Sequence, residues 1–499
     1  MALRCLERPG DYVAGAFRPP NPPEGEISVR SPADASDITA IHPYARASLE
    51  AALRAARQAF PEWRRRSVEQ RAALLLRYQE RLRAHAEELR ERIAREVGKP
   101  LWEAKTEVDS MIAKVDVMLG EARSYTDDRA LPDLPGEIRQ RPLGVIAVIG
   151  PFNFPGHLPN GQIIPALLLG NSVVHKPSER TPSIATWMAR CFDEAGFPPG
   201  VFNVVQGPGT FGAELAQHPE VDGVMFTGSA AVGRRILAGQ GQSFHRLIAL
   251  ELGGKNASIA LDDCDLERTA RALAFAAYVT AGQRCTATSR LIVTPGIARA
   301  LIDRLAEIAR GIRVGDPLAG DVFMGPMIAA DARDRLLAAQ AHARQAGFEA
   351  VVPGGHVQVE GKRGHYVRPA LHVADQPETR VPGYSDVELF GPDLGVYVAR
   401  DFDHALALAN DTWGGLTAGV YTASRSAFER AADELRFGVL HWNRATTGSS
   451  ARLPFGGIGA SGNHRPAGIL AGTACVYPLS VQLPAADPGP LPSWPGVGF

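Results

Sequence analysis

The run Gly144-Val-Ile-Ala-Val-Ile-Gly150 begins the most regular part of this chain. It is short, wholly apolar and rich in β-branched residues, as is typical of a strand buried on both faces of a parallel sheet. Helical and strand-like segments alternate strictly after it. The expected helices cover 158–169, 184–194, 211–218 and a segment from 230, and the expected strands cover 172–175, 201–205, 223–226 and 247–250. This alternation predicts a doubly wound parallel sheet.

A second α/β series begins at Asn256–Leu261. It contains expected helices over 266–280 and 298–311, an expected strand over 290–294, and later β segments near Val351, Val367 and Leu394. The predicted fold class is therefore α/β, with two doubly wound domains that join near Glu251–Gly254. Ligands of such folds bind beyond the carboxyl ends of the strands, and often between domains.

The remaining segments predict smaller elements. We expect residues 1–45 to form an arm, with a short strand over 26–30 that pairs onto a larger body. From 45 to 127, apolar residues recur at three- and four-residue spacing, which predicts helices with one apolar face. Prolines interrupt 128–141, where we expect an exposed excursion, and 473–483 has the pattern of a β strand. Residues 484–499, rich in Pro and Gly, are expected to form a surface tail.

The composition narrows the class of protein. The chain has 499 residues, 45% of them hydrophobic, and a formal net charge of −1, so nothing in its charge favours binding to nucleic acid or to an anionic membrane. The five cysteines are scattered and form no C-x-x-C pair, which argues against a disulfide framework and a zinc site and suits a reducing compartment. The start lacks the apolar core of a signal peptide, and no apolar run is long enough to span a membrane. We expect a cytoplasmic protein without a metal.

One cysteine stands in a setting that favours reactivity, in the stretch Tyr278-Val-Thr-Ala-Gly-Gln-Arg-Cys-Thr286. Cys285 follows an apolar helical run and the helix-breaking Gly282, so backbone N–H groups and Arg284 are expected beside the thiol. Both would lower its pKa and favour the nucleophilic thiolate. The alternative is an inert buried cysteine, which is our interpretation of the other four.

Polar residues follow four of the predicted strands. These are Asn153, the segment Lys176-Pro-Ser-Glu179, the turn Thr227–Gly233, and Glu251. Each alone could be a turn residue, a solvated charge or a helix cap. Together they predict a site at one edge of the sheet. The turn opens a helix whose N–H groups can face a diphosphate, although it lacks the G-x-G-x-x-G pattern. A carboxylate such as Glu179 near an adenosine ribose favours NAD over NADP.

The chain resembles the aldehyde dehydrogenase superfamily over nearly its whole length. The residues that carry the resemblance are Pro151-Phe-Asn-Phe-Pro155, Lys176-Pro-Ser-Glu179, Phe226-Thr-Gly-Ser229, Glu251-Leu-Gly-Gly-Lys255, Gly282-Gln-Arg-Cys285, Glu388-Leu-Phe-Gly-Pro392 and Pro454-Phe-Gly-Gly457, in the order seen in that family. The resemblance implies that Cys285 attacks an aldehyde, that Asn153 stabilises the oxyanion, and that Glu251 activates the water which hydrolyses the thioester.

The resemblance also implies a cofactor and an assembly. NAD would be bound by Lys176, Ser178, Glu179, Gly228, Ser229, Ala230, Ala231, Val232, Gly233, Glu388 and Phe390. It implies an NAD-binding domain over 1–127 and 142–253, a catalytic domain over 254–446, a small β oligomerisation element over 128–141 and 470–485, and a tail over 486–499. Strand exchange through that element implies a homodimer or homotetramer.

The finer resemblance is to the N-succinylglutamate 5-semialdehyde dehydrogenases of arginine catabolism. It is carried by Phe154–Gly161, Val279–Thr286 and Pro454–Pro466. Gly161-Gln162 stands where many relatives of broader specificity have Trp-Lys, which implies a wider substrate tunnel. The substrate carries carboxylates, and the candidate substrate-binding residues are His157, Asn160, Gly161, His464 and Arg465. For His464-Arg465 the alternative is a salt bridge within the loop.

Several departures leave other functions open. Leu252, Lys255, Phe152 and Ala231-Val232 differ from the usual residues of that subfamily. They allow an NAD-dependent dehydrogenase of a different semialdehyde. A cofactor-independent cysteine esterase or thioesterase would share the acyl-cysteine intermediate, and a catalytically silent relative is a third alternative. A relative that transfers the acyl group to coenzyme A is disfavoured because Glu251 is present.

Overall fold

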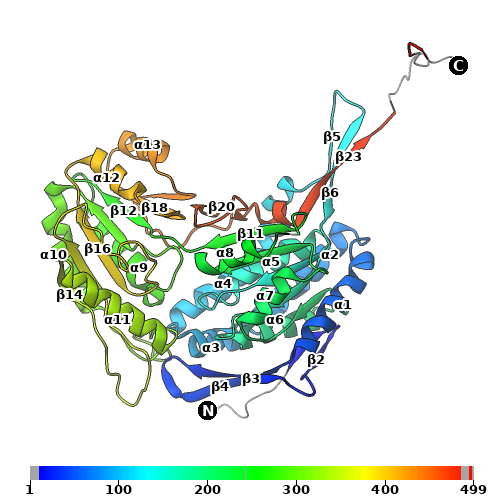
Figure 1. The fold of residues 1–499 in the computed structure, drawn as a ribbon, viewed down its shortest axis with the longest axis horizontal. Coiled ribbons are helices and arrows are strands. Elements are labelled where there is room, and N and C mark those ends of the chain that lie inside the picture. Colours follow the sequence, from blue (N-terminus) through cyan, green and yellow to red (C-terminus); the bar gives the residue numbers. More distant parts are fainter. Residues whose placement is uncertain (1–9, 242, 485–493, 497–499) are drawn as a thin grey trace.

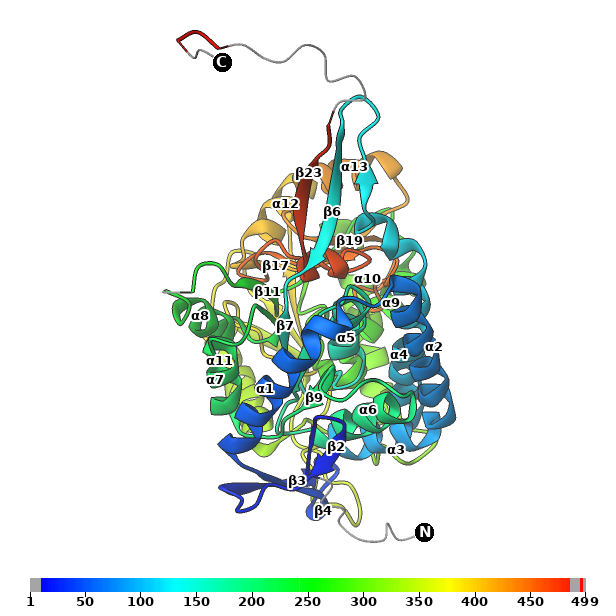
Figure 2. The same cartoon turned by 90° about the vertical axis from the view of Figure 1, so that its right-hand side faces the viewer.

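The computed structural model describes residues 10–241, 243–484 and 494–496. Its two large sheets lie side by side and are covered by helices (Figure 1). A small β element, built from the segments expected to mediate oligomerisation, projects from one end (Figure 2). The residues expected to form the surface tail lie outside the described residues, except for Pro484 and Trp494–Gly496.

The first sheet contains the strands that the alternating pattern predicted. Its order is β11-β10-β7-β8-β9-β1-β2, and β7 to β11 are parallel. The bounds are β7 Val145–Ile149, β8 Ser172–Lys176, β9 Phe202–Val204, β10 Gly223–Gly228 and β11 Leu247–Leu252. The N-terminal strands β1 (Asp11–Val13) and β2 (Ala16–Arg18) extend it in antiparallel fashion, which confirms that the arm pairs onto a larger body.

Helices bury both faces of this sheet, as its apolar strands require. Alternate residues of β7 point to opposite faces, so Ile146 and Val148 belong to one core cluster while Val145 and Ala147 belong to another. The first cluster is formed with helices α2 Val68–Ala84, α3 Ala86–Val97, α4 Leu101–Leu119, α5 His157–Leu168 and α6 Pro182–Glu194. The second is formed with α1 Arg46–Trp63, α7 Gly209–Gln217 and α8 Ala230–Ala238. The helices predicted for 45–127 are confirmed.

The second sheet has the order β14-β15-β16-β13-β12-β18-β19. Its strands are β12 Ala257–Ala260, β13 Arg290–Val293, β14 Phe348–Pro353, β15 Ala370–Ala374, β16 Asp393–Val398, β18 Thr417–Tyr421 and β19 Val439–Trp442. Its helices are α9 Leu266–Tyr278, α10 Pro295–Gly311, α11 Ala330–Gln345, α12 Phe402–Asn410 and α13 Arg425–Glu434. The β segment expected near Val367 is confirmed: Val367 forms an isolated bridge to His356, and the strand β15 begins three residues later, after Pro369, which has no N–H to donate.

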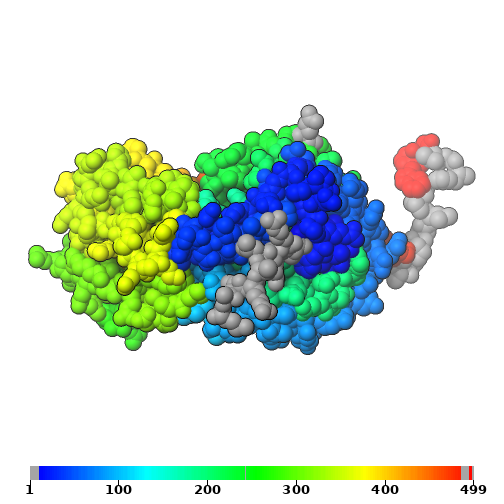
Figure 3. Space-filling model, turned by 90° about the horizontal axis from the view of Figure 1, so that it is seen from below, coloured from blue at the N-terminus to red at the C-terminus, as the bar shows by residue number. Residues whose placement is uncertain are grey.

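Segments far apart in the chain form the projecting element and the domain contact. Strand β23 (Val476–Gln482) pairs along its whole length with β6 (Gly136–Pro142), and β5 (Arg129–Ala130) flanks β6. The hairpin of β3 (Gly25–Ser31) and β4 (Asp34–Tyr44) lies across both domains (Figure 3), where the loop at 363–366 donates to and accepts from its turn. None of the described helices is long and apolar enough to cross a membrane.

Candidate active site

A cavity of about 740 Å³ opens at the carboxyl ends of β7, β10 and β11. Parallel strands present their carboxyl ends at one edge of a sheet, so residues from 150–154, 226–229 and 251–253 share one wall. The second domain supplies the facing wall through 284–286, Glu388 and Phe390. The predicted crevice between the domains is therefore present, and Cys285, Asn153 and Glu251 all line it.

A sharp backbone turn carries Cys285 into the cavity. After α9, Thr280, Ala281 and Gly282 have φ of 59°, 52° and 67°, three successive left-handed residues that reverse the chain. Gly282 is needed there because a Cβ would lie 2.2 Å from the carbonyl oxygen of Gly391. Asn256 Nδ2 donates to the Cys285 carbonyl oxygen at 2.7 Å and fixes the far side of the turn.

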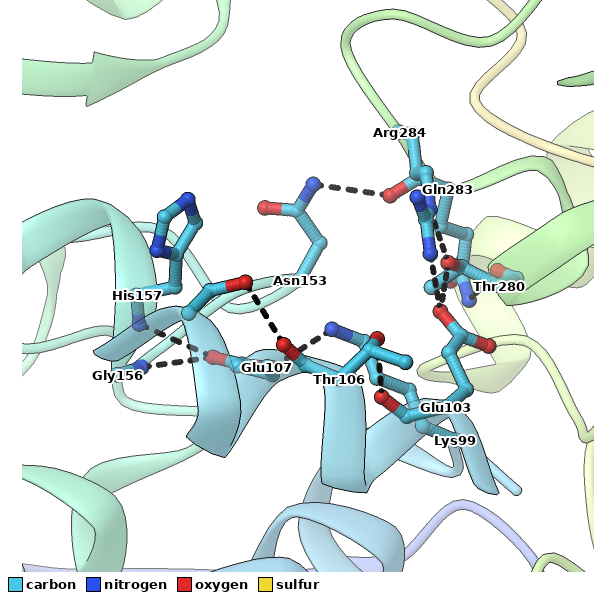
Figure 4. Close-up of polar contacts among 11 residues, drawn as sticks. Lys99, Glu103, Thr106, Glu107, Asn153, Gly156, His157, Thr280, Gln283 and Arg284 are labelled. Carbon is cyan, nitrogen blue, oxygen red and sulfur yellow. Dashed lines mark hydrogen bonds and ion pairs between the residues drawn. The ribbon is translucent and has the colours of Figure 1, made fainter. Parts of the chain in front are cut away.

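The structure corrects the prediction that this setting lowers the pKa of Cys285. Burial, together with the Glu388 and Glu251 carboxylates, raises it to about 12. Arg284 does act in the lowering direction, but its guanidinium pairs with Glu103 at 2.8 Å (Figure 4). The thiol is therefore protonated at neutral pH, and ligands that add positive charge or remove carboxylate charge would activate it.

Asn153 contacts the cysteine turn from the loop that follows β7. It is 4% exposed, and its Nδ2 donates to the Gln283 carbonyl oxygen at 2.9 Å (Figure 4). One of its two N–H bonds is thus used to hold the amide against the turn. The second N–H is available for an oxyanion formed at Cys285.

Glu251 at the end of β11 is a carboxyl poised for proton transfer. Its Oε1 accepts from the Ala467 N–H at 3.1 Å, while Oε2 is buried without a hydrogen-bond partner among the described residues. Burial raises its pKa to about 8. A carboxyl that ionises near neutral pH can take a proton from water, as a general base must.

Glu388 faces the same space from the second domain. Its Oε1 accepts from the Gly254 N–H at 3.4 Å, and burial raises its pKa to about 8. A Cβ on Gly253 would lie 1.9 Å from Glu388 Oε2, so only glycine fits beneath this carboxyl. Phe390 lies edge-on to Phe152 with ring centroids 5.8 Å apart.

The predicted cofactor residues fit a dinucleotide to different degrees. Ser178, Gly228, Ser229 and Val232 line the cavity, and the Ser229 hydroxyl accepts from the Val232 N–H at the start of α8. The other first-turn N–H groups of α8 remain open to an anion. Lys176 Nζ pairs with Glu179 Oε2 at 3.1 Å, in the loop that follows β8. Of the remaining predicted residues, Ala230 and Ala231 form the first turn, and Gly233 packs against Leu252 of β11.

Only two of the five predicted substrate residues line the cavity. These are His157 and Gly161. Asn160 is fully buried: it accepts from the Tyr78 hydroxyl and donates to the Met111 carbonyl oxygen, both at 3.0 Å, so its amide is used within the core. His464 and Arg465 are exposed and do not line the cavity. No salt bridge joins Arg465 to another described residue either, so neither interpretation of that pair is supported.

One wall of the cavity was missed from the sequence. Helix α4 contributes Trp102, Thr106, Ser110 and Lys114, each four residues apart and therefore on one face. The i, i+4 spacing was visible in the sequence. It could not be distinguished from an ordinary solvated helix face, because which elements cover the cavity depends on the tertiary fold.

The comparisons with known proteins agree with this geometry. A sequence profile for the aldehyde dehydrogenase family matches residues 18–477. This chain belongs to the aldehyde dehydrogenase family. An N-succinylglutamate 5-semialdehyde dehydrogenase of Chromohalobacter salexigens is 44% identical over 440 residues, 87% of this chain and 88% of that protein. One of Chromobacterium violaceum is 42% identical over 487 residues, 95% of this chain and 97% of that protein.

Solved structures of the family support the fold and indicate the cofactor. A 1-pyrroline-5-carboxylate dehydrogenase from Thermus with bound NAD matches with a TM-score of 0.89 at 31% identity, covering 95% of this chain and 92% of that protein. The chain is therefore an aldehyde dehydrogenase that uses a nicotinamide cofactor. Among residues 10–241, 243–484 and 494–496, no cluster of His, Cys, Asp and Glu side chains could hold a metal.

Proposed function

We propose that this aldehyde dehydrogenase oxidises N-succinyl-L-glutamate 5-semialdehyde to N-succinyl-L-glutamate with NAD. The observation that carries the proposal is the convergence of Cys285, Asn153 and Glu251 on one cavity whose substrate end has buried positive charge. Both of the bacterial relatives, at 44% and 42% identity, bear the name of this activity. Dehydrogenation of a different semialdehyde is the alternative that the same residues would support.

In the first half-reaction, the Cys285 sulfur adds as its thiolate to the aldehyde carbon and forms a thiohemiacetal. The new oxyanion accepts hydrogen bonds from the free N–H of Asn153 and from the Cys285 backbone N–H. NAD, when bound, would supply the acceptor for the hydride that leaves the same carbon, and its positive ring would oppose the carboxylates that raise the thiol pKa. Loss of the hydride restores the carbonyl group as a thioester on Cys285.

In the second half-reaction, Glu251 takes a proton from water as the water oxygen attacks the thioester carbon. The carbon–sulfur bond breaks, the acid is released as a carboxylate, and the thiolate is restored. The overall balance is aldehyde, NAD and water to carboxylate, NADH and two protons. A cofactor-independent esterase would use only this half, and would not account for the open start of α8 or for the pair of Lys176 and Glu179.

Preference for NAD rests on Glu179. Its carboxylate would face the ribose, and its pKa is lowered by the neighbouring Lys176 ammonium, so it is ionised at neutral pH. An anion there accepts hydrogen bonds from a ribose hydroxyl and repels a 2′-phosphate. We also propose a cytoplasmic homodimer or homotetramer, assembled through β6 and β23, whose Tyr477 and Leu479 are exposed in the single chain.

The test is a panel of semialdehydes assayed with NAD and NADP side by side. NADH formation, followed by its absorbance, should be most efficient, as kcat/KM, with N-succinylglutamate 5-semialdehyde and NAD. Turnover of other semialdehydes without that substrate would overturn the substrate assignment. Ester cleavage unaffected by NAD, without aldehyde oxidation, would overturn the dehydrogenase mechanism itself. Sedimentation velocity at micromolar concentration measures the oligomeric state.

A further inference from the structure

The charges around the substrate end of the cavity do not balance. Three cations lie there: Lys99 and Lys114, which are buried, and Arg284, whose side chain is 11% exposed. Two buried carboxylates of α4 take up two of them (Figure 4). Lys99 Nζ pairs with Glu107 at 2.7 Å, and Arg284 pairs with Glu103 at 2.8 Å.

Lys114 is the cation left over. The residue is 6% exposed and lines the cavity, and no carboxylate or other acceptor among the described residues lies within bonding distance of its ammonium. His157, which also lines the cavity, is held neutral by burial and by the three neighbouring cations, which lower its pKa to about 3. A buried ammonium without a partner is costly, so its place at a cavity wall requires an anion that arrives from outside.

Gly161 is what allows the lysine to lie there. A Cβ built on Gly161 would sit 3.5 Å from both Cε and Nζ of Lys114, so the lysine chain occupies the space beside the glycine. A bulky side chain at 161 would fill that space and expel the ammonium. Gly161, which is expected to widen the substrate tunnel, therefore has a second effect: it leaves room for the charged Lys114 side chain.

We propose that Lys114 binds a carboxylate group of the aldehyde substrate, and that Gly161 permits this by leaving room for the lysine side chain. This proposal rests on the proposed function and extends it, since the preferred substrates are aldehydes that carry a carboxylate. Lys114 then acts on binding and orientation. It does not act on the chemistry at Cys285.

The experiment compares Lys114→Met with wild type on N-succinylglutamate 5-semialdehyde and on pentanal, an uncharged aldehyde. Losing a hydrogen bond to a charged group costs a factor of about 10 to 100, so KM for the acidic substrate should rise by that factor while its kcat stays within about threefold. Kinetics with pentanal should be unchanged within about threefold. Lys105→Met is the matched control, because Lys105 is on the same helix but exposed and paired with Asp109.

Binding of the product N-succinylglutamate, measured by calorimetry, provides a readout that does not depend on turnover. It should weaken in Lys114→Met and in Lys114→Gln, and stay as in wild type in Lys105→Met. Unchanged product affinity and unchanged KM in the Lys114 variants would overturn the proposal while leaving the dehydrogenase function intact. A wild-type enzyme that oxidises pentanal as efficiently as acidic semialdehydes would instead contradict the proposed substrate.

Discussion

Replacement of Glu251 by Gln should abolish turnover and at the same time stabilise the fold. Glu251 is buried, and its pKa rises from the usual 4.5 to about 8. Gln has nearly the same shape and keeps an oxygen that can accept from the Ala467 N–H. The substitution therefore removes the ionisation and little else.

The size of the effect comes from the two pKa values. A carboxyl whose folded pKa is raised contributes stability below its unfolded pKa, and this contribution is lost as the pH rises through the folded pKa. At about 1.4 kcal/mol for each factor of ten, the wild type loses about 3 kcal/mol relative to Glu251→Gln by pH 7 and about 5 kcal/mol above pH 8. Near pH 4.5 this difference vanishes.

The difference is measured by urea unfolding of both proteins at pH 5, 7 and 8.5. Glu388 and the other titrating groups are common to both proteins, so their contributions cancel. In a thermal scan, about 2.1 cal/mol/K per residue over 499 residues makes 3 kcal/mol worth about 3 °C. A stability difference that does not change between pH 5 and 8.5 would refute the argument, because Glu251 would then ionise normally.

The same variant reports on the mechanism. If Glu251 is the base for thioester hydrolysis, Glu251→Gln should release one NADH per active site in a burst, followed by turnover reduced by a factor of about 100 or more. The acyl group should be found on Cys285 by mass spectrometry of the quenched protein. Steady turnover at the wild-type rate would assign the base to another residue.

Asn153→Ala should lower kcat by a factor of about 10² to 10³, as loss of one oxyanion donor does in other enzymes, and should change KM little. Equal losses of ester hydrolysis and of dehydrogenation would show that the amide stabilises the oxyanion common to both reactions. Glu388→Gln should speed alkylation of Cys285 by iodoacetamide at pH 9 by about threefold or more, because the Glu388 carboxylate raises the thiol pKa. The buried Cys191 is the internal control, and an unchanged alkylation rate of Cys285 would contradict this effect of Glu388. Lys114→Met should be more stable than wild type by up to about 3 kcal/mol at pH 7, because burial lowers the Lys114 pKa from 10.5 to about 8. This gain in unfolding free energy should shrink as the pH rises from 8 to 10.5. A gain that grows over that range would contradict the direction of the pKa shift. Gly161→Trp should lower kcat/KM for the acidic semialdehyde by a factor of more than about ten, whereas Gly161→Ala, whose Cβ meets Lys114 at an ordinary 3.5 Å, should stay near wild type.

The sequence was sufficient for the residues that stand at strand ends. Asn153 follows the apolar strand β7 and Glu251 stands at the end of β11, and the carboxyl ends of such parallel strands meet at a single edge. Cys285 could be singled out by its position after Gly282. In these cases the local pattern determines the position, so the prediction needed no knowledge of packing.

The predictions that failed depended on three-dimensional packing. Asn160 is one helical turn from Gly156 and was grouped with the substrate residues, yet its side chain points into the core toward Tyr78. The sign of the Cys285 pKa shift depends on how deeply the thiol is buried and on Glu388, which is more than a hundred residues away. Neither burial nor such a contact is encoded in local spacing.

The wrongly predicted direction of the Cys285 pKa shift and the unpaired Lys114 have a common physical origin. In the protein alone, the Glu251 and Glu388 carboxyls near the reaction centre have raised pKa values and Lys114 has a lowered one, so each of these groups is held in a state that water would not favour. Each therefore costs stability, and each cost falls when a ligand of opposite charge binds. A cationic nicotinamide ring would oppose the carboxylate charge of Glu251 and Glu388, while an anionic substrate would neutralise Lys114. Binding of the cofactor and of an acidic substrate would therefore balance the charges of the site. Selectivity for acidic substrates and activation of Cys285 then arise from the same unbalanced charges.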